Sequence, residues 1–108
     1  RLLNRAEAEE LLDRTPFVRT IDEPNVKLLR AKYTESMRTH DPLEWVRVIK
    51  TVYLRMTSPT SRTQRISETE RSFSDNAKRY LHAELALALG LHEQDMETYI
   101  ADHIQKMA

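Results

Sequence analysis

The chain has 108 residues but only one glycine, Gly90, together with four prolines. Tight turns between antiparallel strands need glycine or asparagine-glycine pairs, so this chain has little material for β-hairpins. Its apolar residues instead recur every three or four positions, which is the spacing of amphipathic helices. The sequence therefore predicts an all-α fold, a compact bundle of about five helices. The length suits a single domain with one core, covering residues 1–108.

The predicted helices are bounded by residues that favour helix ends. Asn4, Asp41 and Ser67 are suitable N-caps, and Gly90 is suited to ending a helix in a left-handed conformation. Ser67-Glu68-Thr69-Glu70 is a capping box and the clearest local signal. The first predicted helix covers residues 5–14, and the second is opened by residues 23–25 and runs to about residue 39. The other three cover residues 42–56, 68–89 and about 93–106. Between the third and fourth, residues 57–66 are predicted to form a mobile loop bearing Arg62 and Arg65.

The third predicted helix has an apolar stripe that runs from Trp45 to Met56. A stripe at this spacing faces a core. We therefore predict that Trp45, the only tryptophan, is a core residue rather than a surface wedge or stacking platform. Residues 17–21 are predicted to form a linker that packs Phe17 and Ile21 down onto the core.

Glu84 stands in a run of apolar residues, 81–89, which predicts a central helix covered by its neighbours. An unpaired charge in such a place costs several kcal/mol. We therefore predict that Glu84 pairs with Arg79, Lys78 or an arginine of another helix, or that it accepts a hydrogen bond from a tyrosine hydroxyl.

Several catalytic and cofactor-binding patterns are missing from the sequence. It has no cysteine, which excludes a disulfide framework, a thiolate metal site and a cysteine nucleophile. A single glycine leaves no glycine-rich phosphate cradle. His92 begins like a zinc-protease helix, but Met96 stands where the second ligand belongs. The residues His82 and Glu84 are two apart and point to different faces of a helix. We expect no enzymatic activity, no cofactor and no metal site.

The composition also bears on the compartment. The absence of cysteine fits a reducing environment, and no apolar leader or long apolar run is visible. We expect a cytoplasmic protein without membrane contact. Because the chain starts at Arg1 rather than methionine, we expect it to be a piece of a longer protein.

The net charge is zero, but the signs are unevenly spread along the chain. Residues 27–79 contain twelve basic and six acidic residues, whereas residues 80–108 contain one basic and five acidic residues. A neutral whole argues against a strong autonomous nucleic-acid binder, yet a basic middle permits one positive face. The alternative is that the basic residues lie on ordinary solvated helix faces and bind no nucleic acid. The candidate phosphate-binding residues are Lys27, Arg30, Lys32, Arg47, Lys50, Arg55, Arg71, Lys78 and Arg79.

Three motifs in a fixed order resemble the C-terminal helical domain of the CarD family (also called CdnL) of bacterial transcription regulators. They are residues 43–50 (LEWVRVIK), 67–71 (SETER) and 84–90 (ELALALG). The opening residues 6–13 (AEAEELLD) resemble the first helix of that domain in Firmicutes-type members. The resemblance covers nearly the whole chain, and the interval from Glu70 to Glu84 is that of the family.

The resemblance implies a five-helix domain that contacts promoter DNA beside RNA polymerase. In this family an N-terminal Tudor-like domain binds the polymerase β subunit, and the helical domain holds open the upstream edge of the melted promoter. The expected partners are therefore promoter DNA, through contacts that do not read sequence, and the polymerase β subunit through an N-terminal domain that is absent from these residues. A tryptophan wedge in the minor groove and basic residues on nearby phosphates make the family's DNA contact.

The family's DNA-contacting positions transfer only in part. When the chain is aligned with the family at Tyr33, the position of the wedge tryptophan corresponds to Leu29. A leucine stacks less well than a tryptophan at a base step. The basic residue before the tyrosine is kept as Lys32, whereas the one after it is Thr34. The basic residue that follows the capping-box glutamate is kept as Arg71. The residues implied to contact DNA are Leu29, Arg30, Lys32, Arg55 and Arg71.

A second interpretation stays open at this point. The chain is then a helical protein-interaction or dimerisation module without DNA binding, with an apolar patch around Phe17, Leu28 and Leu29. It predicts a concentration-dependent mass in solution, whereas the DNA-contacting domain predicts salt-sensitive binding that is lost in a Lys32→Glu and Arg71→Glu variant.

Overall fold

The computed structural model of the chain describes residues 2–58 and 66–107. Within these ranges the chain forms five α-helices, two short 3-10 turns and no strand, so the predicted all-α fold is confirmed. No helix in the same ranges is long and apolar enough to cross a membrane. Most of the predicted loop 57–66, including Arg62 and Arg65, lies outside the described residues. The helices are α1 (Arg5–Arg14), α2 (Val26–Arg38), α3 (Pro42–Thr57), α4 (Glu68–Leu89) and α5 (Met96–Met107), and the turns are Thr15–Phe17 and Glu93–Asp95.

Polar side chains begin α1, α3 and α4 where the sequence predicts, whereas α5 begins at Met96, after a 3-10 turn at the predicted start. Asn4 accepts from the Glu7 amide at 2.8 Å, and Glu7 accepts from the Asn4 amide at 3.0 Å, which completes a capping box. Ser67 accepts from the Glu70 amide at 3.1 Å, but the Glu70 carboxylate turns into the fold instead of back to Ser67. The predicted capping box at α4 is therefore only half formed. Gly90 ends α4 in the left-handed conformation with φ 68°, as predicted.

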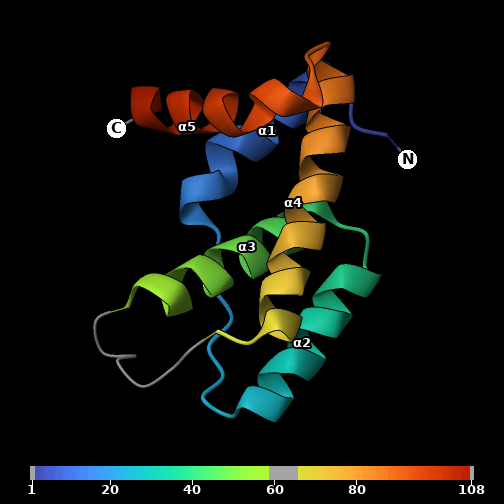
Figure 1. Cartoon of the computed structure of the whole chain (residues 1–108). Coiled ribbons are helices and arrows are strands. Elements are labelled where there is room, and N and C mark those ends of the chain that lie inside the picture. Colours follow the sequence, from blue (N-terminus) through green and yellow to red (C-terminus); the bar gives the residue numbers. More distant parts are fainter. Residues whose placement is uncertain (1, 59–65, 108) are drawn as a thin grey trace.

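Helices α3 and α4 cross at the centre of the molecule and make its most extensive helix-helix contact (Figure 1). The C-terminal half of α4 meets α1 and α5, which also pack against each other. The N-terminal half of α4 meets α2 instead. The long central helix α4 therefore joins two ends of the molecule that share few contacts.

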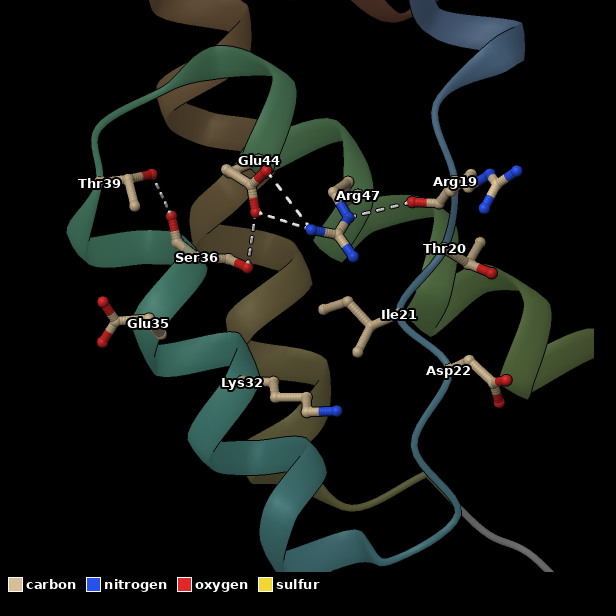
Figure 2. A pocket seen from close by; sticks show the side chains of 10 residues that line it. All are labelled: Arg19, Thr20, Ile21, Asp22, Lys32, Glu35, Ser36, Thr39, Glu44 and Arg47. Carbon is tan, nitrogen blue, oxygen red and sulfur yellow. Dashed lines mark hydrogen bonds and ion pairs between the residues drawn. The ribbon is translucent and has the colours of Figure 1, made fainter.

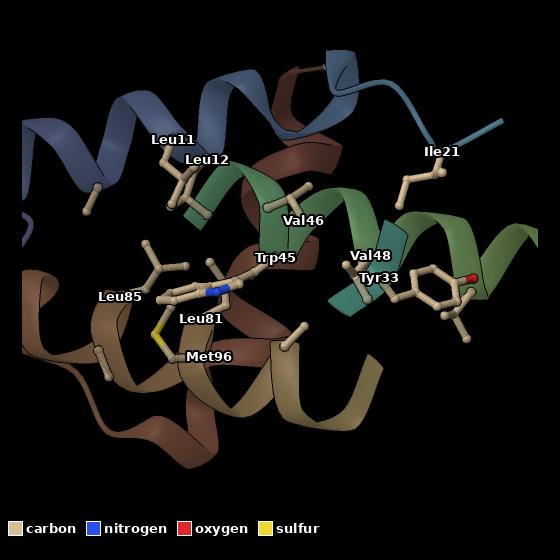
Figure 3. Packing of buried hydrophobic residues seen from close by; sticks show 14 of the residues in the cluster. Leu11, Leu12, Ile21, Tyr33, Trp45, Val46, Val48, Leu81, Leu85 and Met96 are labelled. Atoms are coloured by element: carbon tan, nitrogen blue, oxygen red, sulfur yellow. The ribbon is translucent and has the colours of Figure 1, made fainter. Parts of the chain in front are cut away.

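The core follows the apolar stripes of the helices (Figure 3). Trp45 is buried, as predicted, and packs in the same cluster as Leu81 and Leu85 of α4 and Met96 of α5. Leu12 of α1 belongs to the same cluster. Burial of each large apolar side chain contributes about 2 kcal/mol, so this cluster is the main source of stability where α1 and α5 meet α4.

The linker between α1 and α2 packs differently from the prediction. Ile21 is buried as expected, and its amide donates to the Thr51 hydroxyl at 2.9 Å. Phe17 is 78% exposed, so the prediction that its ring packs onto the core is wrong.

Lys50 binds the backbone of the turn that contains Phe17. Its ammonium group donates to the carbonyl oxygens of Thr15, Pro16 and Val18 at 3.1, 3.2 and 2.7 Å. This polar contact holds the backbone of the 3-10 turn against α3, while the Phe17 ring is exposed to solvent. Burial lowers the pKa of Lys50, but the three carbonyl oxygens use all three of its protons as hydrogen-bond donors.

Candidate nucleic-acid interface

Helices α2 and α4 begin at the same end of the molecule, the lower end in Figure 1. The early turns of both helices carry exposed cations, namely Lys27, Arg30 and Lys32 in α2 and Arg71 in α4. We call these four residues the basic end. Because helix N-termini carry a partial positive charge, two of them at one end add to the potential of the four side chains.

A buried polar cluster ties the two helices together beneath these cations. The Tyr33 hydroxyl of α2 donates to Glu70 Oε2 of α4 at 2.7 Å, and Arg55 of α3 donates to both carboxylate oxygens of Glu70. Glu70 is only 2% exposed. Burial and the neighbouring carboxylate raise the pKa of Tyr33, so its hydroxyl remains a hydrogen-bond donor. This cluster positions the first turn of α4 against α2.

The cluster bears directly on Arg55. Its side chain is 23% exposed, and its Nε and Nη2 protons are directed to Glu70. If the guanidinium group moved to a phosphate, the buried carboxylate of Glu70 would lose its cation, which costs several kcal/mol. The geometry therefore argues against the predicted DNA contact of Arg55 and gives this residue a structural role.

Leu29 is 1% exposed, so the predicted wedge at this position is wrong. Leu29 and Tyr33 lie four residues apart on the apolar stripe of α2, and this stripe faces the core. The preceding residue, Leu28, is exposed instead. Because Leu29 is buried, it is also not part of the exposed apolar patch that the protein-interaction interpretation places around Phe17, Leu28 and Leu29.

Lys32 is accessible but paired. Its ammonium group lies 3.0 Å from Glu23 Oε1, and half of the Lys32 side chain is exposed. The hydrogen bond from Lys32, followed by one from the Asn25 amide, lowers the pKa of Glu23. The Glu23 side chain is only 15% exposed, so this pair is less screened by solvent than an ordinary surface ion pair. Lys32 therefore reaches a phosphate only by giving up its contact with Glu23.

A polar cleft of about 560 Å³ lies between residues 19–22, α2 and α3 (Figure 2). Arg47 Nη1 donates to Glu44 at 3.3 Å, Arg47 Nε donates to the Arg19 carbonyl oxygen at 3.1 Å, and Ser36 donates to Glu44 at 3.0 Å. Its cations and anions are equal in number, so the cleft has no excess positive charge to attract an anion. These charged residues are Arg19, Lys32 and Arg47 against Asp22, Glu35 and Glu44.

The predicted DNA-contacting residues share one end of the molecule but not one helix face. Tyr33 contacts α4 and Ser36 contacts α3, so Arg30 and Lys32 lie on opposite flanks of the buried face of α2. Arg71 shares a face of α4 with Lys78, because the two are seven residues apart. The basic end is thus a spread of cations around two helix N-termini and not a closed pocket.

Sequence reasoning missed the cluster of Tyr33, Glu70 and Arg55. One signal was available, because Tyr33 stands on an apolar stripe and a buried tyrosine hydroxyl needs a partner. The identity of that partner was hidden, since Glu70 lies 37 residues away in the chain and its spacing from Ser67 matches a capping box.

The fold defines this protein as a small all-α domain in which four exposed cations lie in the early turns of α2 and α4. A scan of protein-family models identifies the family, since residues 19–101 match the model for CarD, C-terminal domain. The match covers most of the chain, so the chain belongs to this family of transcription regulators, as the sequence motifs predict.

Comparisons with curated proteins and with solved structures found no relative. Helix α1 lies outside the residues matched by the family model, although Ala8, Leu11 and Leu12 of α1 are part of the buried core.

Proposed function

We propose that the basic end contacts promoter DNA at the upstream edge of the melted region and stabilises the open complex. In this proposal the chain is the DNA-contacting part of a CarD-like regulator that binds the RNA polymerase β subunit through an N-terminal Tudor-like domain. It acts in the cytoplasm by binding alone, without catalysis or a cofactor. The family match and the exposed cations support this proposal.

One observation carries the proposal. Within residues 2–58 and 66–107, the side chains of Lys27, Arg30 and Arg71 are exposed and have no hydrogen-bond or ion-pair partner. Arg47, Lys50 and Arg55, in contrast, are used inside the fold; their partners are Glu44, backbone carbonyl oxygens and Glu70. Cations that the fold does not use are available for phosphates.

The expected contact is electrostatic and independent of base sequence. Four phosphate contacts release counterions and give a log-log salt slope of about −3 to −4. The acidic opposite end of the chain is repelled by DNA, so the molecule approaches with α2 and α4 first. Leu28, exposed in the first turn of α2 beside the buried Leu29, is the apolar side chain that we propose to lie against the distorted base step.

An amide-resolved NMR titration with upstream-fork promoter DNA tests this function at low and moderate salt. We expect shifts at Lys27 to Tyr33 and at Arg71 that fade as salt rises. The variant Arg30→Glu with Arg71→Glu should weaken binding by about tenfold or more, since it reverses two phosphate contacts.

A matched control has the same change in net charge at the other end of the molecule. Arg14→Glu with Lys106→Glu reverses two exposed cations in α1 and α5, and it should retain most of the affinity. Equal losses in both double variants would show that only net charge matters. Absence of shifts at low salt would refute DNA contact by this domain.

A further inference from the structure

A second surface lies away from the basic end, on a face of α4 that neither α2 nor α5 covers. A shallow hollow of about 370 Å³ is lined by Tyr80, Ala83, Glu84 and Leu87 of α4 and by Leu2, His40 and Trp45. Tyr80, Glu84 and Leu87 follow the i, i+4, i+7 spacing of one helix face. We call the hollow formed by these seven residues the Glu84 groove.

Three large apolar side chains border the Glu84 groove, and the exposed His40 lines it as well. Leu2 and Leu87 are about two-thirds exposed, and the half-exposed Tyr80 ring packs against Trp45 with ring centroids 5.8 Å apart. Single exposed leucines are ordinary on a protein surface, but a hollow bordered by three large apolar side chains is typical of a binding surface.

Glu84 sits half-buried in this apolar surface without the partner that its position predicts. Arg79 donates to Asn76 at 2.9 Å and lies over the Tyr80 ring, and Lys78 lines different hollows, on the side of α4 that faces α3. No hydrogen bond or ion pair to Glu84 exists in the described residues. The predicted pairing of Glu84 is therefore not found within the fold.

A second polar group at the groove also lacks a partner. Trp45 is 95% buried, since its exposed fraction is 5%, and its Nε1 proton has no acceptor in the described part of the chain. Buried donors are nearly always paired, either with protein or with water. The groove thus presents an unpaired acceptor and, beneath its surface, an unpaired donor among apolar side chains.

We propose that the Glu84 groove binds a segment of a partner protein in which an arginine or lysine stands between apolar side chains. The cation pairs with Glu84, and the apolar side chains cover Leu2, Tyr80 and Leu87. Charge complementarity selects a cation in the segment, because Glu84 is an unpaired carboxylate that lines the groove. A carbonyl oxygen of the segment, or a water held beneath it, supplies the acceptor that Trp45 Nε1 lacks. This interaction goes beyond the proposed DNA contact and uses none of the residues of the basic end.

Two synthetic peptides test the proposal on the whole 108-residue chain. One carries arginine between two pairs of leucines and has Gly-Ser ends for solubility, and the other has glutamine in place of the arginine. Trp45 is the only tryptophan, so its fluorescence reports binding at the groove directly. We expect the arginine peptide to bind about tenfold more tightly than the glutamine peptide, the size of a partly buried charge-assisted pair.

Variants assign that difference to the groove. Glu84→Gln should remove the preference for the arginine peptide, and Leu87→Ser should weaken both peptides. Glu9→Gln, which removes an exposed acid of α1, should leave the preference unchanged. Circular dichroism checks that each variant keeps its helical content.

Three outcomes would overturn the proposal. Equal affinity for the two peptides would remove the role of Glu84 as a cation acceptor, and no binding of either would remove the groove itself. Self-association of the chain that Glu84→Gln abolishes would make a second copy the occupant instead of another protein. None of these results depends on DNA binding, so the proposal and the proposed function fail independently.

Discussion

The two ends of the molecule are held together by different forces. At the basic end, α2, α3 and α4 meet around the buried carboxylate of Glu70, which binds Tyr33 and Arg55. At the other end, α1 and α5 are joined to α4 mainly by apolar packing around Leu85, and a surface bond of 2.7 Å between His103 and Asp13 adds a polar contact. Directional polar bonds define the orientation of the helices beneath the proposed DNA-contacting surface, whereas apolar burial supplies stability at the opposite end.

This difference explains how a chain of zero net charge keeps a usable positive surface. The fold uses Arg55 to neutralise a buried acid, which removes one cation from the surface but leaves Arg30 and Arg71 free. Helix α5, which has two acidic residues and one lysine, packs at the far end of α4. Part of the opposite charge is therefore separated along the molecule, although Lys32 and Glu23 pair locally.

Leu85→Ala should have the largest effect on stability. The Leu85 side chain is fully buried, so its truncation removes apolar contacts and leaves a cavity that lowers the free energy of unfolding by about 4 kcal/mol. Urea denaturation measures this loss. Leu87→Ala, in the same helix but exposed, should stay within about 0.5 kcal/mol. Similar losses in both variants would contradict the apolar account of this end.

Glu70→Ala should destabilise the chain by about 3 kcal/mol, because it leaves Arg55 half-buried and unpaired. Its control is Glu68→Ala, an exposed acid in the same helical turn, which should cost about 0.5 kcal/mol. Replacing Arg55 by methionine and Glu70 by leucine together should recover part of the stability. Denaturation curves that cannot distinguish Glu70→Ala from Glu68→Ala would mean that the polar cluster contributes nothing.

The smallest effect concerns pH and the half-buried His82. Burial lowers the pKa of His82 below its ordinary 6.5, although Glu97 and Glu93 oppose this shift. Between the lowered pKa and 6.5 the unfolded chain binds a proton that the folded chain does not, so stability falls as pH decreases through this window. His82→Gln should flatten this part of the pH profile of urea midpoints, whereas His92→Gln, at an exposed position, should not. An unchanged slope in His82→Gln would remove His82 as its source.

Local features of the fold were predictable from the sequence, and cross-helix features were not. The cap at Asn4 and the left-handed end at Gly90 follow from residues within a few positions of each other. The burial of Trp45 follows from periodicity. Glu70 shows the limit, because its spacing from Ser67 predicts a capping box, yet a buried tyrosine and an arginine from two other helices compete successfully for its carboxylate.

The candidate DNA-contacting residues show the same division. The family resemblance points to Leu29 and Arg55 as well as to Arg30, Lys32 and Arg71, but the apolar stripe of α2 buries Leu29 and Glu70 binds Arg55. Glu84 is the reverse case. Its position in an apolar run predicts a partner, and the fold provides none in the described residues.

The sequence by itself determined that this chain is helical, because one glycine and a three-to-four residue apolar period leave no competing architecture. It also determined where α1, α3 and α4 start and where α4 stops, since caps are local; α5 starts at Met96, three residues after the predicted position. Only the tertiary structure decided which cations are free, which are consumed and which acid stays unpaired. Ion pairs between helices depend on how the helices are placed in space, and residue spacing along the chain does not encode that placement.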